Sequence, residues 1–243
     1  MYQTLLVEHH NAVGVITLNR PEQLNTYTVR MGEELVHAFD TLKQESSIRV
    51  VVLTGAGRAF CAGVDLKALK GSAPDGQNDD LPTLGQERFV QSFAADLYHY
   101  PKPVIAAING PAVGVGVTMC LPCDVRLAAS DATLAMPFAK LGIVPGLGSS
   151  YLLPRLVGPG NARLLTLAGL RVSAAEALNM RLVEQVYPAE QLLEMTMTLA
   201  ESVAANPPEV ITRIKMALNE GLSAESIQAS IAYEHRCNAQ RAR

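Results

Sequence analysis

Two glycine-rich turns, each placed after a run of apolar and β-branched residues, limit what this chain can fold into. The first turn is Ala62-Gly63-Val64-Asp65, which follows the apolar run at 49–54, and the second is Gly114-Val115-Gly116, which follows the run at 104–108. Glycine lets the main chain bend sharply and approach a ligand closely. Strand, glycine turn and helix alternate through this part of the chain, which predicts an α/β fold with a parallel sheet.

The same two turns are candidates for an anion site. The second turn opens a predicted helix, and the first N–H groups of a helix have no partner within it. Two such N–H groups that meet at one carbonyl oxygen form an oxyanion hole. The donors would belong to the main chain, so valine side chains at Val64 and Val115 are compatible with the role. The alternative is that the glycines only permit tight turns, and the residues alone leave both interpretations open.

The rest of the pattern predicts an α/β core followed by helices, within one large domain or two small ones for 243 residues. Residues 2–19 alternate around a turn, which indicates a β-hairpin, and residues 28–46 carry apolar side chains at helical spacing. Further helices are expected over about 86–100 and through most of the chain from 149 onward. Two capping boxes are predicted, at Ser173-Ala-Ala-Glu176 and Asn206-Pro-Pro-Glu209. Residues 71–84, rich in Gly, Pro, Asp and Asn, indicate a loop.

Charge and missing motifs exclude several classes of function. The net charge is −3, so broad electrostatic binding of nucleic acid is not expected. No apolar run reaches the ~18 residues that a membrane span needs. Position 119 is Met119, so the glycine fingerprint of dinucleotide binding is not met, and neither a P-loop nor a serine nucleophile elbow occurs. We therefore expect no metal and no nicotinamide cofactor.

The four cysteines are too few and too dispersed for a disulfide scaffold. No secretory signal is visible at the N-terminus, so we expect a cytoplasmic protein. Cys120-Leu-Pro-Cys123 has the spacing of a redox pair. It lies between an apolar helix and a strand and has no second pair for zinc. Buried structural cysteine is the favoured interpretation.

Five segments of the chain follow one another in a recognisable order: NRPEQLN, VVVLTGAGRAFCAGVDLKAL, KPVIAAINGPAVGVGVTMCLPCDVRLAA, LAMPFAKLGIVPGLGSSYLLPRLVG and GLRVSAAEALNMRLVEQVYP. In this order they resemble the crotonase (enoyl-CoA hydratase/isomerase) superfamily, in particular its Δ3-Δ2-enoyl-CoA isomerase-like branch. The resemblance runs from about residue 2 to residue 240. It implies the crotonase fold, with a repeated ββα spiral core over 1–190 and a helical trimerisation region over 191–243. It also implies homotrimers or dimers of trimers.

The resemblance further implies a coenzyme A thioester as substrate or ligand, and it assigns roles to positions. The two oxyanion N–H groups would be those of Val64 and Val115. The positions that match the coenzyme A site are Gln23, Leu24, Ala62, Gly63, Asp65 and Leu66. The positions expected around the acyl group are Gly114, Thr118, Pro137, Phe138, Leu141 and Gly146.

The chain departs from the family at the positions of the catalytic acids. Hydratases carry glutamates at the positions held here by Thr118 and Phe138. The isomerase branch keeps its acid in a later V-P-E-x-G-S-S segment, where this chain has Gly146. Moving a proton along an acyl chain needs a base within hydrogen-bond reach, and none of these three residues supplies one. The oxyanion hole and the acyl pocket remain, and they would bind and polarise a thioester.

Three functions stay open on this basis. An isomerase-like enzyme is favoured over a hydratase, and it would need a replacement acid from Asp75, Asp79, Asp80 or Glu87, which lie in or beside the loop at 71–84. A solvated surface charge is the alternative interpretation of each. The second function is a non-catalytic acyl-CoA binder or carrier. The third is other thioester chemistry, such as hydrolysis or decarboxylation.

Overall fold

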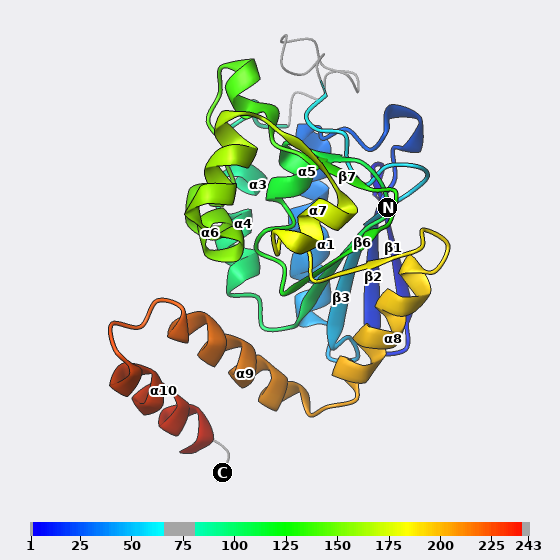
Figure 1. The fold of residues 1–243 in the computed structure, drawn as a ribbon. Coiled ribbons are helices and arrows are strands. Elements are labelled where there is room, and N and C mark those ends of the chain that lie inside the picture. The colour runs from blue at the N-terminus through cyan, green and yellow to red at the C-terminus, as the bar shows by residue number, and fades with distance from the viewer. Residues whose placement is uncertain (1, 66–80, 240–243) are drawn as a thin grey trace.

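Two sheets organise the fold in the computed structural model, which describes residues 2–65 and 81–239 (Figure 1). The larger sheet has the strand order β1-β2-β3-β4-β6-β9, with β1 and β2 antiparallel and the later neighbours parallel. Its strands are β1 (Leu5–His10), β2 (Val13–Leu18), β3 (Val50–Gly55), β4 (Val104–Ile108), β6 (Val125–Ala129) and β9 (Gln185–Tyr187). The smaller sheet contains β5 (Ala112–Val113), β7 (Thr133–Ala135) and β8 (Arg171–Ser173) in that order.

Helices connect and cover the strands. Along the chain they are η1 (Pro21–Gln23), α1 (Val29–Gln44), α3 (Arg88–Gln91), α4 (Phe93–Tyr98), α5 (Val115–Thr118), η2 (Pro137–Leu141), α6 (Ser149–Leu167), α7 (Ala174–Asn179), α8 (Leu192–Ala204), α9 (Pro208–Gly221) and α10 (Ile227–Ala239). Helix α6 is kinked at Gly158, whose φ of 76° is not helical and which precedes a proline.

The buried strands β3 and β4 place both glycine turns at one edge of the sheet. Every residue of β4 is buried, and so is β3 up to Thr54, as expected for parallel strands that are covered on both faces. β3 and β4 are adjacent and parallel, so their carboxyl ends lie at the same edge. The chain segments that follow them therefore leave the sheet side by side.

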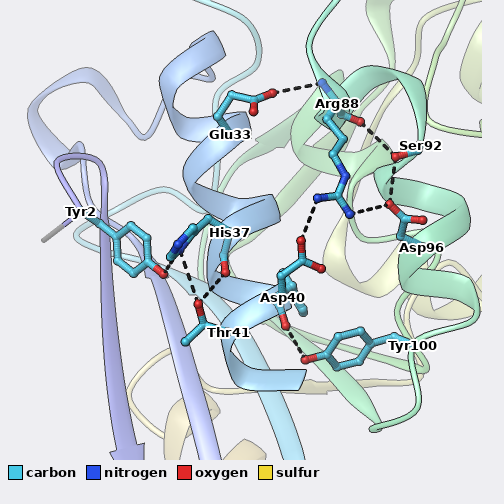
Figure 2. A network of polar contacts seen from close by, with 10 residues as sticks. Tyr2, Glu33, His37, Asp40, Thr41, Arg88, Ser92, Asp96 and Tyr100 are labelled. Carbon is cyan, nitrogen blue, oxygen red and sulfur yellow. Dashed lines mark hydrogen bonds and ion pairs between the residues drawn. The ribbon is translucent and has the colours of Figure 1, made fainter. Parts of the chain in front are cut away.

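Helix α1 holds the short helices α3 and α4 against the body through a polar network (Figure 2). The Glu33 carboxylate accepts a hydrogen bond of 3.0 Å from the main-chain N–H of Arg88, at the start of α3. The Arg88 guanidinium in turn lies 2.7 Å from Asp40 and 3.5 Å from Asp96. At the far end of α4, the Tyr100 hydroxyl donates to the main-chain carbonyl of Phe39 at 2.8 Å. The segment that carries Glu87 is thereby fixed relative to α1.

Most of the predicted elements are present. The hairpin, the helix at 28–46 and the Ser173 capping box are confirmed, with Thr28 capping α1 and Glu176 completing the box. The helix expected over 86–100 is two helices, because the chain leaves helical geometry at Ser92. The capping box at Asn206 is wrong. Helix α9 begins at Pro208 without a side-chain cap, and the Asn206 amide donates instead to carbonyls of the preceding helix.

The C-terminal helices differ in how they contact the body. Helix α8 packs across strands of the large sheet, whereas α9 and α10 extend beyond it as a pair of helices (Figure 1). Lys215 and Asn219 fasten α9: the Lys215 ammonium lies 2.8 Å from Asp124, and the Asn219 amide donates to the carbonyl of Tyr98 at 2.7 Å. Within the described residues, no helix combines the length and apolar character needed to cross a membrane.

Replacing Lys215 by Met should loosen helix α9. The Lys215 side chain is 6% exposed and bonds both Asp124 and the carbonyl of Lys102. Methionine keeps the apolar stem but leaves Asp124 without this partner, so we expect the free energy of unfolding to fall by about 1–3 kcal/mol. Urea denaturation measures that loss, and hydrogen exchange should accelerate in α9. The matched control is Lys43→Met, an exposed lysine in the last turn of α1. Equal exchange in both variants would contradict this account of how α9 is held.

Candidate functional site

The two glycine turns start from one isolated β-bridge between two residues. Cys61 and Ala112 form a parallel bridge, in which the N–H of Cys61 donates to Pro111 at 3.2 Å and the N–H of Val113 donates to Cys61 at 2.9 Å. Val64 lies three residues beyond Cys61, and Val115 lies three residues beyond Ala112. The two turns therefore start side by side, run parallel at the bridge, and reach their valines after the same number of residues.

Two glycines allow the turns to lie against each other. A Cβ atom at Gly116 would stand 2.4 Å from the carbonyl oxygen of Cys61, which is closer than any side chain can approach. A Cβ at Gly63 would stand 3.4 Å from the carbonyl oxygen of Val113, and the φ of Gly63 is +107°. Close contact between the turns thus depends on missing side chains as well as on conformation.

The main-chain N–H of Val64 points away from Tyr27, its partner in a parallel β-bridge. On one side of the turn, Tyr27 donates to the carbonyl of Gly63 at 2.8 Å and accepts from the N–H of Asp65 at 2.9 Å. Successive N–H groups of an extended chain point to opposite sides, so the N–H of Val64 faces the other way. It donates no hydrogen bond to any residue that the structure describes.

The main-chain N–H of Val115 is left unpaired by its position in helix α5. Val115 is the first residue of that helix, and its N–H has no acceptor within it. The preceding residue, Gly114, has φ 56° and ψ −112°, which is outside the regions that side-chain-bearing residues favour. Its own N–H donates to Ala135 of β7 at 2.8 Å and so anchors the turn. Among the described residues, the N–H of Val115 has no acceptor either.

Both valines line one cavity of about 500 Å³. The resemblance assigned roles to many of the residues around it: Gln23, Ala62, Gly63, Val64, Asp65, Gly114, Val115, Pro137, Phe138 and Leu141. Thr26, Val113 and Ile143 also line it and were not expected from the sequence. The structure therefore gathers four of the six coenzyme A candidates and four of the six acyl-pocket candidates around one cavity, together with Val64 and Val115.

Three expected residues do not line the cavity. Leu24 lies behind it and accepts a hydrogen bond of 3.0 Å from the N–H of Ala62. Thr118 is 1% exposed, and its hydroxyl donates back to the carbonyl of Val115 within helix α5. Gly146 lies on the approach to α6 with open space where a side chain would begin. Leu66 lies outside the described residues, as do Asp75, Asp79 and Asp80.

The acidic groups near the site are already engaged. Glu87 is 0% exposed and does not line the cavity, because its carboxylate accepts hydrogen bonds from the Tyr27 hydroxyl and from the N–H of Gly85. Asp65 is the one acidic side chain at the cavity in the described part of the chain. Its carboxylate lies 3.5 Å from the guanidinium of Arg20, which also donates to the carbonyl of Thr26 at 2.6 Å.

Buried thiols pack beneath the turns and are not poised to react. Burial raises the pKa of Cys61 to about 11 and that of Cys123 to about 12, and it raises the pKa of Cys120 well above its usual value. All three are free cysteines and stay protonated near neutral pH. This supports the structural interpretation of the C-x-x-C pair. In the parts of the chain that the structure describes, no three His, Cys, Asp or Glu residues are grouped as metal ligands.

The model of one protein family, enoyl-CoA hydratase/isomerase, matches residues 8–241. The chain belongs to the enoyl-CoA hydratase/isomerase family. Its two sheets and helical C-terminal part are therefore an instance of the crotonase fold. The family assignment agrees with a cavity lined by Val64 and Val115, whose main-chain N–H groups have no acceptor among the described residues.

Named members of the family include both isomerases and hydratases. The chain is 38% identical to 1,2-epoxyphenylacetyl-CoA isomerase of Escherichia coli (strain K12), over 90% of this chain and 83% of that protein. It is 33% identical to the short-chain-enoyl-CoA hydratase of Clostridium acetobutylicum, over 95% of this chain and 86% of that protein. A crystal structure of an enoyl-CoA hydratase from Bacillus anthracis superposes with a TM-score of 0.88 at 36% identity, over 98% of this chain and 90% of that one.

Replacing Gly116 by Ala should force the two turns apart. The new Cβ would stand 2.4 Å from the Cys61 carbonyl oxygen and 2.9 Å from the Cys61 Cβ, and overpacking of this kind costs about 1–3 kcal/mol of unfolding free energy. Urea denaturation measures the change. Gly160→Ala in α6 is the matched control, because a Cβ there meets nothing within 4 Å, and we expect it to be neutral or stabilising by up to about 1 kcal/mol. Equal stability of the two variants would disprove the close contact.

Proposed function

We propose that this family member binds an acyl-coenzyme A and polarises its thioester carbonyl with the main-chain N–H groups of Val64 and Val115. The observation that carries the proposal is that both N–H groups lack an acceptor among the described residues while both valines line the same cavity. Donors fixed in advance in a water-poor site stabilise the charge that develops on the oxygen, at a few kcal/mol for each donor. Coenzyme A would lie along Gln23, Leu24, Ala62, Gly63, Asp65 and Leu66.

A double-bond shift suits this cavity better than hydration. Polarising the thioester acidifies the adjacent carbon, which is the step that a double-bond shift needs. Hydration needs a held water as well. At the two positions where hydratases carry glutamates, Phe138 gives the cavity an apolar wall and the Thr118 hydroxyl is turned into its own helix. Neither can orient a water for attack, so an isomerase-like reaction is the preferred assignment.

The second candidate function is binding without catalysis. Asp65, the acidic side chain at the cavity in the described residues, is paired with Arg20, and Gly146 supplies no acid at the isomerase position. Proton transfer needs a base within about 3 Å of the proton that it removes. A chain with the thioester-binding groups and without that base would act as an acyl-CoA binder or carrier.

Self-association would cover the exposed apolar side chains of the C-terminal helices. Large apolar side chains stand exposed on α9 and α10, at Ile214, Leu218, Leu222, Ile227 and Ile231. Large apolar side chains gathered on exposed helices in this way are compatible with a protein interface. We propose that these helices contribute to a homotrimer or a dimer of trimers, and a cytoplasmic location remains a prediction.

A panel of thioesters tests the reaction. Offered trans-3- and trans-2-hexenoyl-CoA, the purified protein should bind both with a Kd on the order of micromolar. It should convert the trans-3 form into the trans-2 form, seen as the rise of conjugated-thioester absorbance, with no hydration of the trans-2 form. If the protein binds the thioesters without converting them, the carrier function is favoured. If it hydrates the trans-2 form, the isomerase assignment is wrong. Absence of binding to either thioester would remove the proposal altogether.

Replacing Gly146 by Glu should create or raise isomerase activity. The position matches the isomerase acid, and nothing lies within 4 Å of a Cβ built there, so the first side-chain atom meets no clash. General acid–base help is worth typically 10²–10⁴-fold, and we expect at least about 10-fold from an unrefined placement. Gly146→Gln is the control, with the same shape and no proton to transfer. Equal rates in two folded, ligand-binding variants would count against this placement of the acid.

A further inference from the structure

We propose that Tyr27 and Glu87 are positioning residues for the oxyanion hole, acting through the turn that carries Val64. The inference rests on the proposed function and deepens it, since neither side chain touches the cavity. The main chain of Tyr27 holds the turn. The side chain of Tyr27 is in turn held by Glu87.

The main chain of Tyr27 fixes the turn on both sides of Val64. It donates to Gly63 at 2.8 Å and accepts from Asp65 at 2.9 Å, and no other described residue bonds the main chain at both of these points. A rotation of this segment would turn the Val64 N–H with it, because the two hydrogen bonds flank that N–H directly. The direction of the first oxyanion donor is therefore set by where Tyr27 lies.

The side chain of Tyr27 is locked in the core. It is 1% exposed, its ring centroid lies 4.9 Å from that of Phe89, and its hydroxyl donates to the Glu87 carboxylate at 2.7 Å. Burial and the nearby carboxylate raise the pKa of Tyr27, so the phenol stays protonated and remains a donor at any ordinary pH. A buried Glu87 without this donor would lose a hydrogen bond that water cannot replace.

Helix α1 makes room for this contact. A Cβ at Gly32 would stand 2.3 Å from the Tyr27 hydroxyl oxygen and 2.9 Å from the Cβ of Phe89. Glycine inside a helix costs about 1 kcal/mol relative to alanine. The chain therefore carries a locally unfavourable residue at the one point in α1 where a side chain would displace the phenol.

Glu87 is fixed from the other side by the network between α1 and α3 (Figure 2). The next residue, Arg88, has its N–H on the Glu33 carboxylate and its guanidinium on Asp40. The second oxygen of Glu87 accepts from Gly85. Hydrogen bonds from α1 to Arg88, the main-chain link from Arg88 to Glu87, and the hydrogen bonds of Glu87 and Tyr27 thus connect α1 to the turn of Val64.

Tyr27→Phe is the variant that tests this role, and Tyr100→Phe is its matched control. Each removes one buried tyrosine hydroxyl with a hydrogen bond of 2.7 or 2.8 Å in the same aromatic region. Tyr100 makes no contact with either turn. The probes are hexanoyl-CoA and its thioether analogue S-hexyl-CoA, which has no carbonyl oxygen, so the ratio of their Kd values reports on the oxyanion donors alone.

We expect the wild-type protein to prefer the thioester, and Tyr27→Phe to reduce that preference about 3–10-fold, the equivalent of one impaired hydrogen bond. Tyr100→Phe should keep the preference. The infrared carbonyl stretch of bound hexanoyl-CoA should shift back towards its value in water in Tyr27→Phe only. An unchanged preference and stretch in folded Tyr27→Phe would overturn the inference. If the wild type itself shows no preference for the thioester, it is the proposed function that fails.

Glu87→Gln removes the negative charge of residue 87 but keeps its shape and hydrogen bonding. It also tests the inference if Tyr27→Phe does not fold. The glutamine amide can accept from Gly85 and pair with the Tyr27 hydroxyl, so a positioning role predicts that most of the thioester preference is retained. Glu87→Leu removes the partner and should reproduce the loss. If Glu87→Leu, folded, keeps the full preference, Tyr27 does not need Glu87 to aim the turn, and the inference is overturned.

Discussion

The pairing of Cys61 with Ala112 is the contact on which the site depends. It joins the segments that follow β3 and β4, and it exists because those two strands are adjacent and parallel. From that pair each turn reaches its valine, Val64 or Val115, after three residues. The missing side chain at Gly116 lets them stay in contact. A change in this pairing would move one of the proposed donors relative to the other, whereas the side chains of the two valines contribute to packing, with Val115 in the core and Val64 against it.

In the proposed function the donors are main-chain groups, so thioester binding and proton transfer would be separate properties of this scaffold. The turn of Val64 is held by Tyr27 and the turn of Val115 by Ala135, without help from any catalytic side chain. An acid or base can then be added, moved or omitted on the cavity wall while the oxyanion donors stay in place. Relatives of similar identity, 38% and 33%, are named as an isomerase and as a hydratase, in keeping with this separation. Fold and binding are shared, and the reaction depends on a few wall positions.

The sequence predicted what is local and strongly periodic. The hairpin alternates apolar and polar residues, α1 has apolar residues at helical spacing, and β3 and β4 are short apolar β-branched runs, so each pattern points to one type of element. Ser173 has its capping partner, Glu176, three residues later. Four strands, β5, β7, β8 and β9, are only two or three residues long. They form because they pair with neighbouring strands, and they are too short to show an alternating pattern in the sequence. Asn206 had the capping pattern, yet a proline at the helix start and nearer carbonyls for its amide decided otherwise. At the site, the turns of Val64 and Val115 were visible as glycine patterns. Tyr27 and Ile143 were not, because they reach the site by tertiary contact alone.

Glu87 shows how burial decides what an acidic residue does. In the sequence it stands beside the segment where a replacement acid was expected, and its charge alone suggested chemistry. In the structure both carboxylate oxygens accept hydrogen bonds and no part of the side chain is exposed. A carboxylate in that state has no free oxygen to receive a substrate proton and no path by which to pass one to water. The role that we propose for Glu87 is therefore indirect, through the position of Tyr27 and hence of the Val64 N–H, and any proton transfer would have to come from a group that faces the cavity itself.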